Sequence, residues 1–188
     1  MNDGLEIEFE EDDSGAFPVV SMKPLGELAR RIEKERQRKG LGDPLNDNSQ
    51  LDDGYRYHDV FHLAHVTVLG WSPVLRALMG AKRKQADGVL DRTQDGARAI
   101  ALEEGLVAFA FRALESDGFL AKSGRMDWDL VNHIRRTVRG TEVEDQPPIA
   151  WQRTYKSACE VFLQLTSQRG GTVICDLDKQ MLHYRKPS

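Results

Sequence analysis

Apolar residues recur at helical spacing over most of this 188-residue chain, and this pattern constrains its fold more than any other feature. Gly70 ends one such segment, and Ser72 followed by Pro73 is typical of an N-cap and a first-turn proline for the next. The final segment changes period: TVICDLD and MLHY flank Lys179-Gln180 and favour a short hairpin. The pattern predicts helices over residues 24–39, 57–69, 73–84, 94–116, 126–139 and 149–168.

These elements predict a mainly α fold, a compact bundle of about six helices with a short C-terminal β-hairpin. The acidic stretch LEIEFEEDD alternates briefly, as an edge strand would, but the acidic run and the Ser-Gly after it favour a loose arm. We therefore expect residues 1–22 to be a flexible acidic N-terminal arm and residues 23–188 to form a single helical domain. A chain of this length suits one hydrophobic core.

Composition narrows the classes of partner. The net charge is −4, so no overall field attracts nucleic acid or an anionic membrane, and nucleic acid is an unlikely partner. No apolar run approaches the roughly 20 residues of a membrane helix, and the acidic start does not resemble a signal peptide. The two cysteines, Cys159 and Cys175, are too few for a disulfide framework. We expect a cytoplasmic protein.

The segment YHDVFHLAH places three histidines within a helix that is otherwise nearly apolar. His58 and His62 are four residues apart and His65 follows three later, so all three project from one side of the helix, with Asp59 on its flank. Two imidazoles at this spacing can bind one divalent metal ion, with a carboxylate from elsewhere completing the shell. His65 alone is better explained as a hydrogen-bonded packing residue.

The long helix carries two adjacent carboxylates, of which Glu104 lies in its apolar stripe beside Glu103. A buried unpaired charge costs several kcal/mol, so Glu104 must be protonated, paired or bound to a cation. The histidine face is the nearest source of partners. A His/Glu pair that joins two helices without any metal is the structural alternative.

Basic residues near the start of the long helix could hold a phosphate. Lys82, Arg83 and Lys84 precede it, and backbone N–H groups at a helix N-terminus favour an anion. A solvated helix end is the simpler explanation of the three cations. Arg98 lies inside the helix, and we expect it to pair with Asp95 three residues earlier.

Several motifs in this order resemble the C-terminal domain of MazG-like nucleoside triphosphate pyrophosphohydrolase proteins. They are GDPLNDNSQLDDGYRYHDVFHLAH, LGWSPVLRALMGAKRK, QDGARAIALEEGLVAF, VRGTEVED with a later Trp151, and FLQLTSQRGGTVICDLD. The resemblance runs from about Gly42 to Tyr184. By position it carries over the polar residues His58, Asp59, His62, Asp95, Arg98, Glu103 and Glu104.

The resemblance implies a nucleotide-related function, but one set of family motifs is missing. The family's pyrophosphohydrolase domain carries an EExxE run and a later ExxD that hold magnesium, whereas GELARRIEKE offers only Glu27, Glu33 and Glu35. The chain therefore resembles the companion domain standing alone.

Two functions compete on these grounds. In the first, the chain is a metal-dependent nucleotide hydrolase, a pyrophosphohydrolase acting on phosphoanhydride bonds. Its metal ligands are His58, His62 and Glu104, its general base is Asp59 or Glu103, and Arg98 or Lys82, Arg83 and Lys84 hold the phosphate. This ligand set favours manganese, zinc or iron over magnesium. In the second, it is a non-catalytic module that binds a nucleotide or a protein partner. A homodimer is compatible with either.

Overall fold

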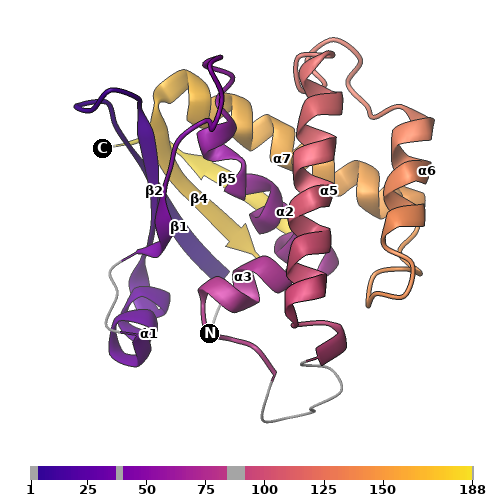
Figure 1. Ribbon diagram of the computed structural model, residues 1–188, viewed down its shortest axis with the longest axis horizontal. Coiled ribbons are helices and arrows are strands. Elements are labelled where there is room, and N and C mark those ends of the chain that lie inside the picture. The colour runs from indigo at the N-terminus through magenta and orange to yellow at the C-terminus, as the bar shows by residue number, and fades with distance from the viewer. Residues whose placement is uncertain (1–3, 37–39, 84–91, 188) are drawn as a thin grey trace.

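The computed structural model describes residues 4–36, 40–83 and 92–187 (Figure 1). One layer is a five-stranded antiparallel sheet with the strand order β3-β2-β1-β4-β5. Its strands are β1 (Gly4–Asp12), β2 (Val19–Pro24), β3 (Leu41–Leu45), β4 (Gly170–Asp176) and β5 (Met181–Arg185). The prediction of a mainly α bundle with one short hairpin is therefore wrong. The predicted hairpin does form as β4 and β5, but as one edge of a larger sheet.

The N-terminal segment is a central strand and not a flexible arm. β1 pairs with β2 on one side and with β4 on the other, and Ile7 and Phe9 are buried. The glutamates that alternate with them lie on the open face, where Glu10 forms an ion pair with Lys23 and Glu6 with Arg185. The acidic alternation is thus that of a strand with one buried and one solvated face. Its main partner, β4, lies more than 150 residues away along the chain.

Helices account for most of the remaining described residues. They are α1 (Gly26–Arg36), α2 (Asp59–Leu69), α3 (Pro73–Leu78), α5 (Ala97–Glu115), α6 (Trp128–Thr137) and α7 (Pro148–Gln168), with a 3₁₀ turn η1 (Tyr55–Tyr57) before α2. The predicted helices match these closely, except that α3 ends at Leu78 and does not reach residue 84. Gly80, with φ of 69°, follows α3 in a left-handed conformation, which does not continue a helix.

The helices cover one face of the sheet. α2 and α7 lie against β4 and β5, α5 packs on α2 and α3, and α6 packs on α5 and α7 at the side of the molecule away from the sheet (Figure 1). Large side chains of α2, α5 and α7 fill the space between these layers, with Phe61, Phe111 and Phe162 in mutual ring contact. α2 is therefore enclosed on nearly all sides. Within the described part of the chain, none of the helices combines the length and apolarity needed to span a membrane.

Candidate metal centre

The polar residues of α2 are buried because the whole helix is buried. All residues of α2 except Val66 are buried, including Asp59, His62 and His65. Gly70 ends the helix in a left-handed conformation with φ of 67°, and this lets the chain turn at once into α3. Each polar group on α2 needs a partner inside the protein, since burial without one costs several kcal/mol.

Glu103 supplies partners for two of these groups. Its Oε1 accepts hydrogen bonds from Nδ1 of His62 at 2.9 Å and Nδ1 of His65 at 3.0 Å. Its Oε2 accepts from the Ser72 hydroxyl at 3.1 Å and the Val74 backbone N–H at 2.9 Å. The carboxylate is fully buried, so it is satisfied by the protein alone. Ser72 is also the predicted N-cap of α3, since its Oγ accepts from the Leu75 N–H.

His65 completes this network as a structural residue. Its Nε2 lies 3.3 Å from the Tyr155 hydroxyl of α7, which donates to it. Burial lowers the pKa of His65 and outweighs the opposing effect of Glu103, so the ring is neutral. Together His65 and Glu103 join α2, the start of α3, α5 and α7. The expectation that His65 is a hydrogen-bonded packing residue is confirmed.

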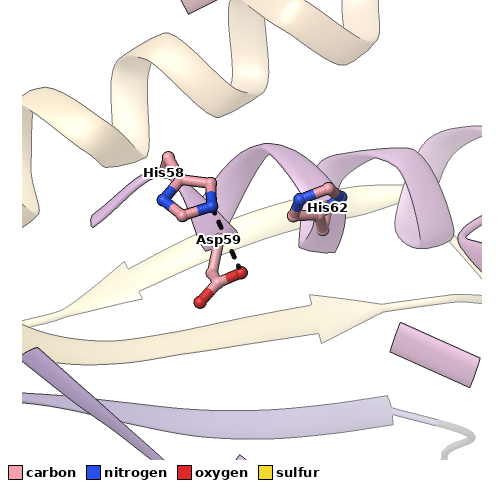
Figure 2. Close-up of side chains that lie close together, drawn as sticks. All are labelled: His58, Asp59 and His62. Atoms are coloured by element: carbon pink, nitrogen blue, oxygen red, sulfur yellow. Dashed lines mark ion pairs between the residues drawn. The ribbon is translucent and has the colours of Figure 1, made fainter. Parts of the chain in front are cut away.

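His58 and His62 share a different arrangement (Figure 2). In each ring Nδ1 donates to a fixed acceptor: His62 to Glu103, and His58 to the Tyr55 carbonyl oxygen at 2.9 Å. Tyr55 also stacks on the His58 ring at 4.2 Å between centroids. Because Nδ1 is occupied, each ring presents Nε2 as its remaining nitrogen. A hydrogen-bonded Nδ1 of this kind orients a histidine that ligates metal through Nε2.

Carboxylates lie beside both Nε2 atoms. Asp59 Oδ1 is 3.9 Å from Nε2 of His58 (Figure 2), and the Asp59 carboxylate has no hydrogen bond to any described residue. Glu104 Oε2 is 3.4 Å from Nε2 of His62, close enough for an ion pair but too poorly aligned for a hydrogen bond. His58, Asp59 and His62 each offer one ligand atom within 4.8 Å of the others. We call His58, Asp59, His62 and Glu104 the α2–α5 cluster.

The protonation of this cluster follows from burial and charge. Burial disfavours a charged His62 ring, but the Glu103 carboxylate outweighs it and raises the pKa of His62 to about 10. Burial raises the pKa of Asp59. The neighbouring His62 lowers the pKa of Glu104, whose side chain is 45% exposed. Without a bound cation His62 therefore carries a proton, and that positive charge lies beside the Glu104 carboxylate.

Sequence comparison places the chain among known proteins. The family model of the MazG C-terminal domain matches residues 19–188. The chain belongs to this family. No curated protein and no solved structure matched it. The resemblance expected from motifs such as HDVFHLAH and ALEEG is thereby confirmed, over residues 19–188 of this chain.

The predicted phosphate-binding residues do not gather at the cluster. Arg83 donates to both oxygens of the buried Asp95 and to Glu142, and Arg76 lies 2.8 Å from Asp95 Oδ1. Asp95 is thus paired with these two arginines and not, as expected, with Arg98. Arg98 is exposed, six residues before Glu104 and so on a different side of α5.

The two lysines that were also predicted to bind phosphate do not add a phosphate-binding group to the α2–α5 cluster. Lys82 is half-buried and forms no ion pair with another described residue, and Lys84 lies outside the described residues.

The surroundings of Glu103 and Glu104 are the reverse of those predicted from the sequence. Glu103, predicted as a general base, is enclosed by four hydrogen-bond donors, whereas Glu104, predicted as the buried ligand, is the half-exposed one. Tyr55 and Ser72 were not predicted as part of the site. Their signal was available only in part: Ser72 was recognised as an N-cap, but its contact with Glu103 depends on how α3 meets α5.

Proposed function

We propose that His58, Asp59 and His62 bind a divalent cation and that the site hydrolyses a phosphoanhydride bond of a nucleotide. One observation carries this proposal: both histidines are fixed through Nδ1, and the Nε2 atom of each lies beside a carboxylate, the buried Asp59 for His58 and the half-exposed Glu104 for His62. A cation is the group that would satisfy the Nε2 atoms and the Asp59 carboxylate at the same time.

The donor set fits a transition metal. Ligand atoms of one ion lie about 3–4 Å apart, since metal–ligand bonds are about 2.0–2.2 Å long. The ligand atoms of His58, Asp59 and His62 all lie within 4.8 Å of one another, so a small contraction would suffice to bind one ion. Two imidazole nitrogens favour manganese, zinc or iron over magnesium. A positive cation would also displace the proton from His62, so binding should release about one proton per ion.

The exposure of each side chain to solvent suggests its role in the reaction. A bound cation would supply a Lewis acid that polarises a phosphoryl oxygen. Glu103 would hold the His62 ring in place from behind. Asp59 is buried and can only face the cation, whereas Glu104 reaches solvent and can accept the proton of an attacking water. Glu104 is therefore our candidate for the general base.

Metal binding and hydrolysis can be tested separately. Purified protein is stripped with EDTA, reloaded with Mn²⁺, Zn²⁺ or Fe²⁺, and its metal content is measured after gel filtration. We expect about one ion per chain, its loss in His62→Ala, and its retention in His183→Ala, a matched substitution of an exposed histidine on β5. Circular dichroism would verify the fold of each variant. Absence of stoichiometric metal from the folded wild-type chain would contradict the site.

A nucleotide panel then tests the reaction. With the metal that binds best, product formation from nucleoside triphosphates and diphosphates is followed by chromatography. We expect Glu104→Gln to retain the metal and to lose hydrolysis at least about a hundredfold, the usual contribution of a general base. Full activity in this variant would remove Glu104 from the mechanism.

A second candidate is a non-catalytic companion module that binds a nucleotide or a protein. It is favoured by the Glu103 network, which satisfies its own buried groups without a cation and joins four elements. Folded protein that takes up no metal and cleaves no member of the panel would support this candidate. Metal uptake without hydrolysis would support binding as the function.

A further inference from the structure

We infer that the outer face of α6 is a second, metal-independent site that binds a nucleoside phosphate. An open hollow of about 480 Å³ lies between the end of α6 and the turn after it. It is lined by Asn132, Arg135, Arg136, Arg139, Glu144 and Asp145. None of these residues belongs to the α2–α5 cluster, and α6 lies on the side of the molecule away from the sheet (Figure 1).

The arginines of this hollow form no close ion pair with another described residue, although two carboxylates share the hollow with them. Among the described residues, Arg56, Arg76, Arg83 and Arg169 each form ion pairs, but Arg135, Arg136 and Arg139 form none. The Nε of Arg135 is buried and has no hydrogen-bond partner in the described part of the chain. Three adjacent guanidinium groups repel one another, and each offers donors that match phosphate oxygens. The negative end of α6 explains a preference for cations there, but not a buried donor without a partner.

An exposed aromatic ring continues the same face. Trp128, Asn132 and Arg135 are spaced four and three residues apart on α6, so they lie along one side of the helix. Trp128 is 56% exposed, whereas Trp71 and Trp151 are buried. From Trp128 to Arg135 the helix rises about 10 Å, a span that a nucleoside diphosphate can bridge. A base stacked on the indole would place its phosphates at the arginines.

The acidic residues of the hollow favour a small ligand over a polymer. Asp145 and Glu144 line it beside the arginines, and they would repel a phosphate backbone that continued through the hollow. Their carboxylates can accept hydrogen bonds from sugar hydroxyls or amino groups of a single nucleotide. The overall charge of −4 also disfavours a polyanion.

The position of Trp128 provides a direct measurement. ADP is titrated into the 188-residue chain in low-salt buffer with EDTA, which keeps the α2–α5 cluster free of metal, and tryptophan fluorescence is recorded together with calorimetry. We expect saturable quenching by ADP, and competition by inorganic pyrophosphate without quenching of its own. In Trp128→Phe the quenching is lost, and calorimetry should show affinity lowered about tenfold.

Variants separate this site from the rest of the molecule. The double variant Arg135→Gln/Arg139→Gln should weaken ADP binding at least tenfold, whereas Arg153→Gln, an exposed arginine on the neighbouring α7, should not change it. Because ADP binding is measured in EDTA, failure of the metal centre and failure of this site are distinguishable.

Three results would overturn the inference. The first is no ADP binding at millimolar concentration, and the second is equal binding by the double variant whose melting temperature matches wild type. The third is a single-stranded oligonucleotide that binds more tightly than ADP through the same arginines, which would assign the face to nucleic acid.

Discussion

Glu103 accepts four hydrogen bonds where no water reaches, and His62 carries a proton because of it. The folded-state pKa of His62 is about 10 against an ordinary 6.5, so the stabilisation from this pair is complete below about pH 6.5 and declines as the pH rises toward 10. The pKa of Glu103 is lowered: burial alone would raise it, but the His62 charge and the bonds from His62 and His65 outweigh burial. The stability that the ionised Glu103 contributes is therefore lost only at a pH below the ordinary range of a glutamate pKa.

Glu103→Gln removes the negative charge but keeps the size of the side chain. We expect it to lower the free energy of unfolding at pH 6 by about 3 kcal/mol, because breaking a buried ion pair leaves groups unsatisfied. We also expect it to abolish the loss of stability between pH 6.5 and 10 that wild type shows through His62. Urea unfolding of EDTA-treated protein at pH 6 and pH 9 measures both. A pH dependence identical to wild type would show that the pair is not coupled as described.

The sequence could predict which residues meet but not how they share roles. His58 and His62 were identified because helical spacing alone places them on one face, and spacing is local information. The roles of Glu103 and Glu104 were not predictable in the same way, since adjacent helix positions differ by about 100° and the choice depends on how α5 is rotated against α2. That rotation is set by packing of α3 and α6 on α5, which involves residues distant in the sequence.

Among the elements, α3 and α5 are joined by a buried carboxylate. Asp95 accepts from the Arg83 backbone N–H and guanidinium and lies 2.8 Å from Arg76 Nε, so it fixes the chain before α5 to the end of α3. Burial would raise the pKa of Asp95, but the hydrogen bonds from Arg83 outweigh it and the pKa is lowered. The stability it provides is present at neutral pH and declines as the pH falls.

Asp95→Asn should therefore lower the free energy of unfolding by about 3 kcal/mol at pH 7, and by less only at a pH well below the ordinary Asp pKa of 3.8, where wild type also loses the charge. Asp129→Asn, an exposed carboxylate in the first turn of α6, is the control and should change it by under about 1 kcal/mol. Urea titrations at pH 7, and in steps below pH 4, compare the two variants with wild type. If Asp95→Asn lowered the free energy of unfolding no more than Asp129→Asn does, the connection between α3 and α5 would not depend on the Asp95 charge.

Replacement by alanine should have opposite effects on stability at two glycines, Gly171 and Gly105. Gly171 in β4 has φ of 133°, and a Cβ added there would lie 2.5 Å from Cε2 of Tyr184 on β5. Gly105 is in the middle of α5, where an added Cβ meets nothing within 4 Å. We expect Gly171→Ala to destabilise the protein by more than about 1 kcal/mol through strain and overpacking, and Gly105→Ala to stabilise it by about 0.5–1 kcal/mol. Thermal melts would show shifts of opposite sign, and a rise for Gly171→Ala would contradict this backbone conformation.

At the scale of the whole molecule, the sheet is the part that sequence reasoning could not assemble. The apolar spacing that indicates a helix lies within the helix's own residues, so α5, α6 and α7 were predicted nearly to their ends. β1 instead depends on β4, which follows it by more than 150 residues, and β3 contains Gly42 and Pro44, which are typical of a turn. The alternation in LEIEFEEDD was recognised, but its acidic residues were interpreted as a sign of a flexible arm. They form the solvated face of a strand whose other face packs on the core.

The central position of β1 leads to a prediction about the entire fold. Removing residues 1–12 deletes the strand that separates β2 from β4, together with the buried Ile7 and Phe9. A flexible arm could be removed without loss, whereas loss of this strand opens the sheet, leaves unpaired backbone groups and exposes the core under β1. We expect the truncated chain to lack a cooperative unfolding transition and to be rapidly cleaved by protease. Removal of residues 186–188, which follow β5, is the matched control and should leave the melting temperature within about 2 °C of wild type. A cooperative, wild-type-like melt of the chain lacking residues 1–12 would mean that the helices form a stable fold without β1.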